Sequence, residues 1–257
     1  MLGLLYRFYE RRLLQEVRAK PMPRHVGIIL DGNRRYGREQ GFANPSLAYE
    51  IGAQKLDDVL EWCANLDLAA VTLWVFSTAN LRRTTDEISG ILSAVETKMR
   101  LLAKDARIHS RRVRVRAVGR LELLPASVLT AIRAAEKATE AYDSMILTIA
   151  IAYGGREEII DAFRALLQDQ RRKGDTLEQI IEQISPTAVD RYLYTANLPD
   201  PDLIIRTSGE VRLSGFLLWQ SAHSEFYFSD VYWPAFRKID FLRAIRSYQQ
   251  RQRRFGR

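Results

Sequence analysis

The chain has 257 residues, 47% of them hydrophobic, and its 39 lysines and arginines outnumber its 31 aspartates and glutamates to give a net charge of +8. This length suits one large hydrophobic core and argues against two full domains, while the positive charge favours an anionic partner: a nucleic acid, a membrane surface or a phosphorylated small molecule. A single cysteine, Cys63, excludes an internal disulfide framework and suits a reducing compartment.

The first segment of the chain, residues 2–17, spaces apolar residues among arginines and glutamates as an amphipathic helix does. We expect a helix within residues 1–21 that packs on the domain, and contact with a membrane surface is the alternative. No stretch reaches the roughly 18 to 20 consecutive apolar residues that span a bilayer, and the start lacks the pattern of a cleaved signal peptide. The expectation is a cytoplasmic protein for which peripheral membrane contact stays open.

Strand-like and helix-like segments alternate along the rest of the chain. Short apolar runs rich in Val, Ile and Leu predict strands at residues 26–30, 70–76, 113–118, 145–152, 202–206 and 216–219. Helical patterns cover residues 46–65, 85–104, 126–141, 157–172 and 239–253. The alternation predicts an α/β fold: one doubly wound domain, residues 22–257, around a mostly parallel six-stranded sheet.

Asp31-Gly32-Asn33-Arg34-Arg35 directly follows the first predicted strand. Such a turn lies at the carboxyl edge of a parallel sheet, where α/β proteins bind ligands. The glycine lets the backbone approach phosphate oxygens, the arginines can bind them as bidentate donors, and the aspartate can hold a divalent metal. The pentapeptide by itself is equally compatible with an ordinary polar turn.

Two further polar loops follow the second and fifth predicted strands. Residues 77–83 combine hydroxyls, an amide and arginines, beside a helix start that the capping-box pattern of residues 84–87 predicts. Residues 206–214 place two arginines and several hydroxyls around Gly209, a composition able to hold a second diphosphate. Each loop is a weak signal, but three at one sheet edge indicate two phosphorylated substrates.

These segments resemble the cis-prenyltransferase family, whose bacterial type is undecaprenyl diphosphate synthase, and most closely its short-chain, Z-farnesyl-diphosphate-synthase-like branch. The resemblance rests on five ordered blocks: HVGIILDGNRRYGRE at 25–39, TLWVFSTANLRR at 72–83, IAYGGREEI at 151–159, DLIIRTSGEVRLSGFLLWQSAHSEFYF at 202–228 and RRFG at 253–256. It implies that residues 22–257 form a Mg2+-dependent, homodimeric enzyme. Such an enzyme joins isopentenyl diphosphate to an allylic diphosphate and sets the new double bond cis.

The resemblance also implies roles for single residues. Asp31 would handle Mg2+ and assist departure of the allylic diphosphate, Asn80 would take part in proton removal through water, and Glu225 would complete the metal environment at the dimer edge. The residues implied in substrate binding are Gly32, Asn33, Arg34, Arg35, Tyr36, Tyr49, Ser77, Thr78, Ala79, Leu81, Arg83, Arg206, Arg212, Leu213, Ser214, Arg254 and Gly256. The last two match a C-terminal motif that reaches into the partner's site.

A hydrophobic tunnel for the growing prenyl chain is implied as well. The pattern alone favours ordinary core packing for a helical stripe that, by the resemblance, would line this tunnel: Ile88, Ile91, Leu92, Val95, Met99 and Leu102. Val75 stands where long-chain members tend to carry a small residue, so we expect it, with Ile91, Val95 and Met99, to limit product length. The expected product is of the fifteen-carbon Z,E-farnesyl type, and a longer-chain polyprenyl diphosphate synthase is the alternative.

The chain departs from the family pattern near the allylic site. Ala79 replaces a glutamate, Leu81 an aromatic residue, Tyr49 a histidine and Tyr36 a tryptophan, and residues 42–47 lack an arginine that many members have. These changes leave the aspartate and the isopentenyl diphosphate residues intact.

Two functions of other classes stay open. A non-catalytic partner subunit typically lacks the metal aspartate, so the presence of Asp31 with Asn80 argues against it. A nucleic-acid-binding protein would use the basic run of residues 111–116, but alternation along a strand places several of those arginines on one solvent face. We therefore expect no nucleic-acid partner.

Overall fold

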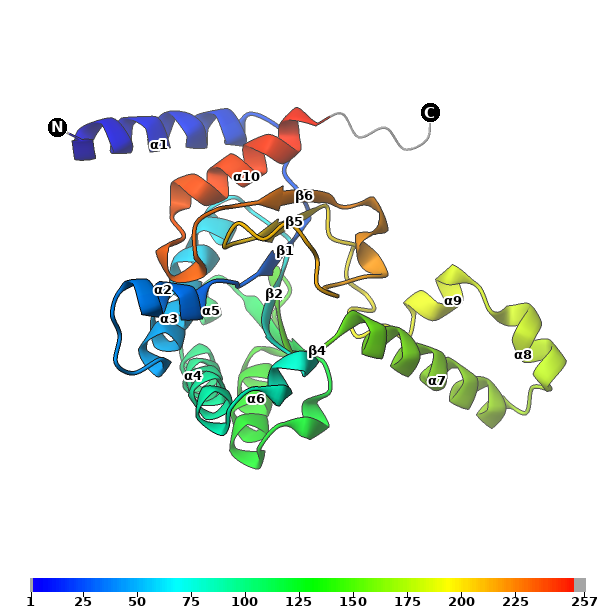
Figure 1. Cartoon of the computed structure of the whole chain (residues 1–257). Coiled ribbons are helices and arrows are strands. Elements are labelled where there is room, and N and C mark those ends of the chain that lie inside the picture. The colour runs from blue at the N-terminus through cyan, green and yellow to red at the C-terminus, as the bar shows by residue number, and fades with distance from the viewer. Residues whose placement is uncertain (1, 252–257) are drawn as a thin grey trace.

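The computed structural model describes residues 2–251, with side chains from residue 6 onward, and is built around one six-stranded sheet (Figure 1). Its strands are β1 (His25–Ile29), β2 (Ala70–Ser77), β3 (Val113–Val118), β4 (Met145–Tyr153), β5 (Leu203–Arg206) and β6 (Glu225–Phe228). They pair in the order β3-β4-β2-β1-β5-β6, and every pairing is parallel. The predicted α/β class with a parallel six-stranded sheet is thus confirmed.

The strand order places a topological switch point between β1 and β5. The chain leaves β1 toward β2 on one side of it and leaves β5 toward β6 on the other. In such sheets the loops that follow the two strands diverge and leave a crevice at their carboxyl ends. The loops after residues 29 and 206 therefore face each other across this crevice.

The larger core lies between one face of the sheet and a layer of helices, and its fully buried side chains include Ile28 of β1 and Leu73 of β2. The helices of this layer are α1 (Leu2–Arg18), α3 (Ser46–Asn65), α4 (Thr85–Leu102), α6 (Ala126–Thr139) and α10 (Lys238–Gln250). Short helices α2 (Asn33–Glu39) and α5 (Ala106–Ser110) lie in the connections. Helices α3 and α4 pack against each other, and so do α4 and α6, which leaves α4 in the middle of this layer.

The opposite face is covered by the connection between β5 and β6 rather than by a layer of helices. Trp74 of β2 stacks on Phe216 of that connection, with 5.4 Å between ring centroids. The strand predicted at residues 216–219 is therefore wrong: these residues form turns, and the sixth strand is β6. Phe216 and Leu217 are consecutive and both 0% exposed, and Leu217 has φ 45°, so the apolar run reports burial in a turn and not an extended strand.

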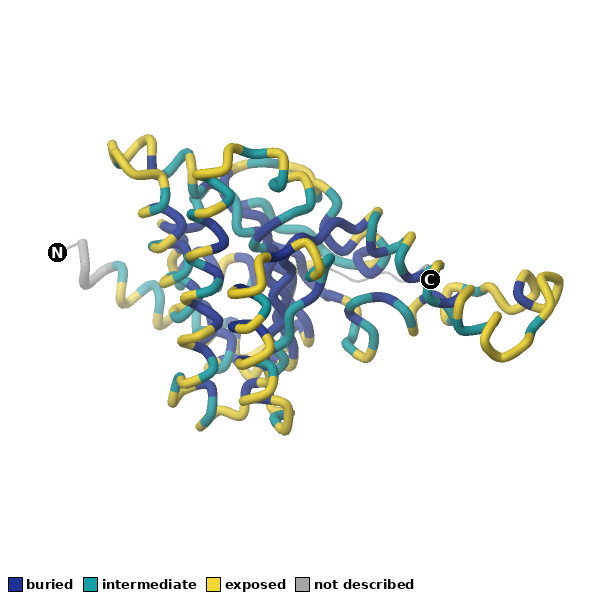
Figure 2. Tube along the Cα trace, turned by 90° about the horizontal axis from the view of Figure 1, so that it is seen from below, coloured by how far each residue is buried: buried dark blue, intermediate teal, exposed yellow. Residues whose placement is uncertain are grey.

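Helices α7 (Gly155–Lys173), α8 (Leu177–Gln183) and α9 (Pro186–Asp190) form an arm that projects from the domain (Figure 1). A small core of its own contains Ala162, Leu166, Val189 and Leu193. Much of its surface is exposed (Figure 2), including Leu177 at 65% and Ile181 at 61%. The arm thus presents apolar side chains that no other part of residues 2–251 covers.

Helix α1 packs along α10 through the buried side chains of Leu13 and Val17. Glu10 and Glu16 pair with Lys238 and Arg246 of α10, at 3.2 and 3.8 Å. Within residues 2–251, no helix is both long enough and apolar enough to cross a bilayer.

Candidate active site

A cavity of about 550 Å3 opens at the carboxyl edge of the sheet, beside the switch point. Its mouth is lined by polar residues from the loops after β1, β2 and β5, and its inner part by apolar residues of β2, β4, α3 and α4. Six arginines lie in its lining, together with the carboxylates of Asp31 and Glu210: Arg34, Arg35, Arg38, Arg83, Arg206 and Arg212. A polar, cationic mouth above an apolar interior suits an anionic group attached to a hydrocarbon.

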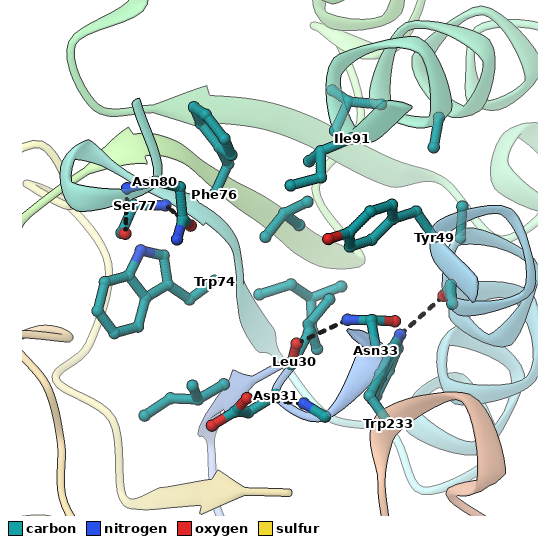
Figure 3. A pocket seen from close by; sticks show the side chains of 18 of the residues that line it. Leu30, Asp31, Asn33, Tyr49, Trp74, Phe76, Ser77, Asn80, Ile91 and Trp233 are labelled. Atoms are coloured by element: carbon teal, nitrogen blue, oxygen red, sulfur yellow. Dashed lines mark hydrogen bonds between the residues drawn. The ribbon is translucent and has the colours of Figure 1, made fainter. Parts of the chain in front are cut away.

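Asp31 emerges from β1 into this mouth (Figure 3). Its backbone N–H donates to Thr207 Oγ1 at 2.9 Å, and its Oδ1 accepts from the Gly32 N–H at 2.7 Å. Gly32 has φ +103°, and a Cβ there would lie 2.6 Å from Tyr232 Cδ1. Only glycine therefore fits this turn without strain or displacement of the tyrosine ring.

Arg206, at the end of β5, is the main partner of Asp31. Its side chain is 6% exposed and lies 2.7 Å from Asp31 Oδ2. Burial by itself raises the pKa of Asp31, but the hydrogen bond and charge of Arg206, with smaller help from Ser208 and the Gly32 N–H, lower it below its usual value. Asp31 therefore stays ionised at neutral pH.

Arg206 also holds the loop that follows β5. It donates to Ser214 Oγ at 2.7 Å and to the carbonyl of Arg212, and its buried Nε has no partner within residues 2–251. Ser208 and Ser214 both have positive φ, at 84° and 53°. Such backbone persists only where its surroundings hold it, so this loop offers Ser214 and Arg212 to a ligand in a fixed geometry.

The loop after β2 fixes the orientation of Asn80. Asn80 Oδ1 accepts from the Ser77 N–H at 2.8 Å, and Ser77 Oγ accepts from the Asn80 N–H at 3.2 Å. Figure 3 shows this pair and Asp31 on the wall of the same cavity. Because the amide oxygen is engaged, the amide NH2 group is the part of Asn80 available to a ligand or water.

The helix start predicted after this loop is present, but the capping box is incomplete. Thr84 Oγ1 accepts from the Glu87 N–H at 3.4 Å. The Glu87 carboxylate does not reach back and instead lies 3.4 Å from Arg34 of α2. This contact joins the first turn of α4 to the mouth of the cavity.

Most of the predicted site residues meet in this cavity, although they come from distant parts of the chain. Its lining includes Asp31, Gly32, Asn33, Arg34, Arg35, Tyr49, Ser77, Asn80, Arg83, Arg206, Arg212 and Ser214, and also Val75, Ile91, Val95 and Met99. Four residues of the predicted α4 stripe, the last being Leu102, belong to the core and also line the cavity, whereas Ile88 and Leu92 pack with the core but lie outside the lining.

Other predicted residues lie outside the lining. Tyr36 packs edge-on against Phe42 at 6.0 Å, Thr78 donates to Glu157 at 3.3 Å, and Leu213 packs in the core under the loop after β5. Ala79 and Leu81 belong to the 3-10 helix Thr78–Arg82 that follows β2. Arg254 and Gly256 lie outside the described residues.

Glu225 lies at the amino ends of the strands, whereas Asp31 lies at their carboxyl ends. It begins β6 and pairs in register with Leu203, the first residue of β5, whereas Arg206 ends β5 beside Asp31. Its carboxylate binds Arg251. Within one chain Glu225 cannot share a ligand with Asp31, so a role at the metal would have to act across a dimer.

The cavity also contains residues that the sequence motifs did not single out. Arg38 lies one helical turn after Arg34, a spacing that could have revealed it, and Glu210 pairs with Arg35 at 3.1 Å. Lys98 interrupts the apolar stripe of α4 three residues after Val95, so it too was visible in the pattern. Trp233, also in the lining, donates from Nε1 to the Gly52 carbonyl at 2.7 Å.

Val75 lies at an irregular point of β2. The register of β2 with β4 shifts between Trp74 and Phe76, and again before Ser77. A bulge of this kind turns two consecutive side chains toward one side. Val75 and Phe76 accordingly both pack with the larger core, while Trp74 packs on the other face.

The polar groups of the mouth fit one kind of metal site. No group of three or more His, Cys, Asp or Glu side chains gathers to hold a metal anywhere in the described part of the chain. Mg2+ often binds through one or two carboxylates and completes its shell with water and substrate phosphates. Asp31, 29% exposed at the cavity mouth, suits Mg2+ bound mainly by a diphosphate and not a preformed metal cage.

Comparisons with known proteins agree with this geometry. The family described as "Putative undecaprenyl diphosphate synthase" matches residues 29–256. An isoprenyl transferase of Thermus thermophilus is 54% identical over 98% of this chain and 96% of its own length. The crystal structure of lavandulyl diphosphate synthase from Lavandula x intermedia, in complex with dimethylallyl diphosphate, superposes with a TM-score of 0.84 at 30% identity, over 94% of this chain and 100% of that one.

Two relatives at nearly equal identity differ in the product that their names give. A (2Z,6E)-farnesyl diphosphate synthase of Thermobifida fusca is 50% identical over 98% of this chain and 97% of its own length. A tritrans,polycis-undecaprenyl-diphosphate synthase (geranylgeranyl-diphosphate specific) of Methanopyrus kandleri is 51% identical over 98% and 92%. Overall identity therefore does not decide chain length.

Proposed function

The chain belongs to the undecaprenyl diphosphate synthase family of cis-prenyltransferases, and we propose that it condenses isopentenyl diphosphate with a short allylic diphosphate to make a fifteen-carbon Z,E-farnesyl diphosphate. One observation carries the proposal: a cationic mouth opens directly into an apolar cavity lined by Val75 and the α4 stripe. The diphosphates would bind at the mouth, and the hydrocarbon would extend inward.

The mouth offers two groups of anion-binding residues, one from α2 after β1 and one from the end of β5 and the loop that follows it. Arg34, Arg35 and Arg38 of α2 would bind the allylic diphosphate with the backbone of Gly32, and Arg206, Arg212 and Ser214 would bind isopentenyl diphosphate. The ion pair at 2.7 Å spans the crevice between β1 and β5 and keeps the two groups at a fixed separation. This arrangement would place the two substrates for direct reaction.

Ionisation of the allylic diphosphate develops negative charge on the leaving group. The arginines of α2 would stabilise that charge more in the transition state than in the ground state. Mg2+ held by Asp31 and the diphosphate oxygens would add to this stabilisation when bound. Apolar walls beyond the mouth would exclude water from the allylic cation.

Carbon–carbon bond formation must be followed by loss of a proton from the isopentenyl unit. An amide is too weak a base to take that proton itself. Asn80, oriented through Ser77, would instead use its NH2 group to place a water molecule or a diphosphate oxygen that accepts the proton. Arg83, which donates to Tyr49 Oη at 3.5 Å, would hold the nearby wall of the mouth.

The test is direct. The purified protein, with Mg2+ and labelled isopentenyl diphosphate, would be given dimethylallyl, geranyl or farnesyl diphosphate, and product length and double-bond geometry would be measured. We expect a new cis bond and a product that stops at fifteen carbons. Products of polyprenyl length would contradict the short-chain assignment, and a trans bond would contradict the reaction.

We propose that the enzyme is a homodimer in which one chain completes the other's site. The exposed Leu177, Ile181 and Ile184 of the arm suit burial in an interface, and Glu225 lies on the edge strand β6, far from its own chain's Asp31. Light scattering should give twice the chain mass. Glu225→Gln should reduce activity without changing that mass; a fully active monomer would exclude the assembly.

We also propose that the protein is cytoplasmic and makes peripheral contact with an anionic membrane through α1. Arg7, Phe8, Arg11 and Arg12 are exposed, Phe8 at 67%, whereas Glu10 of the same helix is paired with α10. The protein should co-sediment with phosphatidylglycerol vesicles and not with phosphatidylcholine vesicles. Replacement of Arg11 and Arg12 by Gln should abolish that difference, and equal binding to both vesicles would contradict the proposal.

A further inference from the structure

Lys98 is a lysine in the apolar wall of the cavity. It lies on α4 among Ala94, Val95, Met99 and Leu102, all of which line the cavity with it. Its side chain is only 10% exposed. Lysine is rarely buried to this extent unless its ammonium group is paired.

The ammonium group of Lys98 is paired across two helices. Its Nζ lies 2.7 Å from Oδ1 of Asp57 on α3. Helices α3 and α4 pack against each other and both contribute to the lining. The ion pair therefore joins two walls of the cavity along the line where these helices meet, which we call the α3–α4 seam. Lys98 lines the cavity, and its charge reaches the more exposed Asp57, as is usual for a partly buried lysine.

The need to neutralise Asp57 does not explain why residue 98 is a lysine. Arg107 NH2 also lies 3.1 Å from Asp57 Oδ1, so Asp57 keeps a cationic partner without Lys98. An apolar residue at position 98 would continue the stripe of α4 and would bury no charge. What distinguishes the lysine from a leucine or methionine is the ion pair by which it joins α4 to α3 at the cavity wall.

The position of Lys98 along α4 corresponds to the inner part of the cavity. The helix begins at the mouth, where Glu87 contacts Arg34. Lys98 follows 11 residues later, which is about 16 Å along the axis of an α-helix. A hydrocarbon that grows inward from the mouth reaches Ile91 and Val95 first and Lys98 after them.

We propose that Lys98 limits the length of the prenyl product by closing the α3–α4 seam with Asp57, a proposal that rests on the proposed function. A longer chain must either press hydrocarbon against a partly buried ion pair or separate α3 from α4. Both are unfavourable, because the charges lose solvation or their mutual contact and a packed helix pair resists insertion. Elongation stops when the chain end meets this side chain.

Two substitutions separate the contributions of the stem and of the charge. Lys98→Ala removes both and should lengthen the main product by at least one isoprene unit. Lys98→Met keeps the stem but releases α3, so it should lengthen the product less than alanine does. Arg100→Ala is the matched control, since Arg100 is on the same helix but 52% exposed and paired with Glu96, and the product should not change.

The first condensation should keep its rate within about twofold in all three variants, because it takes place at the mouth. Unchanged product distributions in both Lys98 variants would overturn the proposal. A longer product with Arg100→Ala as well would also overturn it, because general loosening of α4 would then explain the effect.

A second measurement does not depend on turnover. Thiolodiphosphates of geranyl, farnesyl and geranylgeranyl chains, which resist ionisation, would be compared by the rise in melting temperature that each gives. Wild-type stabilisation should level off at the chain length that fills the cavity, and Lys98→Ala should move that limit to the next length. An unmoved limit refutes the role of Lys98; a moved limit in a protein that makes no prenyl product refutes the proposed function alone.

Discussion

Replacement of Asp31 by alanine tests the centre of the proposed site. The change removes the carboxylate 2.7 Å from Arg206, whose side chain is 6% exposed, but leaves the hydrogen bonds of Arg206 to Ser214 and to the Arg212 carbonyl. Removal of one partner of a buried ion pair costs about 3–5 kcal/mol of unfolding free energy, and because Asp31 is partly exposed and Arg206 keeps its other bonds we expect about 1–3 kcal/mol. The variant should therefore stay folded.

Activity should fall much further than stability. Loss of one fixed group that acts on developing charge lowers kcat by about 10²–10³-fold, and Asp31 would act on the metal and on the leaving group together, so condensation should be effectively abolished. Turnover would be measured at saturating substrates and Mg2+, and stability by urea unfolding. Near-wild-type turnover in a folded Asp31→Ala protein would refute the mechanism.

Glu210→Ala is the matched control for this experiment. Glu210 is a second carboxylate of the cavity lining, 28% exposed and paired with Arg35 and Arg212. Its removal should change turnover only several-fold. If both variants lose activity equally, the loss reflects the charge of the mouth in general and not a specific role of Asp31.

The Asp31→Ala variant also predicts how stability depends on pH. The pKa of Asp31 is lower in the folded protein than in the unfolded chain, because Arg206 outweighs the effect of burial. The stabilisation is therefore complete above the unfolded pKa of about 3.9 and is lost as the pH falls through the folded value. The stability difference between wild type and Asp31→Ala should accordingly shrink below about pH 4; a difference that grows there would reverse the sign of the argument.

Three further predictions concern the cavity wall, the C-terminal tail and the turn at Gly32. Val75→Ala should lengthen the product, because it removes a branched side chain from the cavity wall, and an unchanged product distribution would exclude Val75 as a limit. Truncation before Arg253 should weaken use of isopentenyl diphosphate more than it lowers the melting temperature, whereas full activity without the tail would count against a C-terminal contribution. Gly32→Ala should lower the unfolding free energy by about 1–3 kcal/mol, and more than Gly41→Ala, because both have positive φ but only at Gly32 would a Cβ meet other atoms within 4 Å.

The elements of the fold follow closely from local patterns. The apolar runs at 26–30, 70–76, 113–118 and 145–152 coincide with β1 to β4 within a residue or two, because buried parallel strands need continuous apolar side chains. The same rule failed at 216–219, where two adjacent buried residues belong to a turn under the sheet. Helices α8 and α9 of the arm had no prediction, since at 7 and 5 residues they are too short for a helical period to be recognised.

The site was predictable as a set of loops, but its contacts were not. Family motifs and strand ends indicated Asp31, Asn80 and Arg206 separately. The motifs also suggested Tyr36 and Leu213, which pack elsewhere, because a motif includes residues that shape a loop as well as residues that face a ligand. Lys98 shows the reverse case: its place in the stripe was visible, while its partner Asp57 was not.

The sequence by itself determined which segments are buried strands and helices and which loops carry charge, because those properties depend on neighbours along the chain. The tertiary structure decided what depends on strand order and packing: the approach of Asp31 to Arg206 across 175 positions, the bulge that turns Val75 toward the larger core, and the closure of the α3–α4 seam. These contacts join residues distant in sequence, and local preferences contain no information about which of them meet. The motifs thus predict which polar and charged groups lie at the mouth, whereas the shape of the hydrocarbon cavity arises only from the packing of the folded chain.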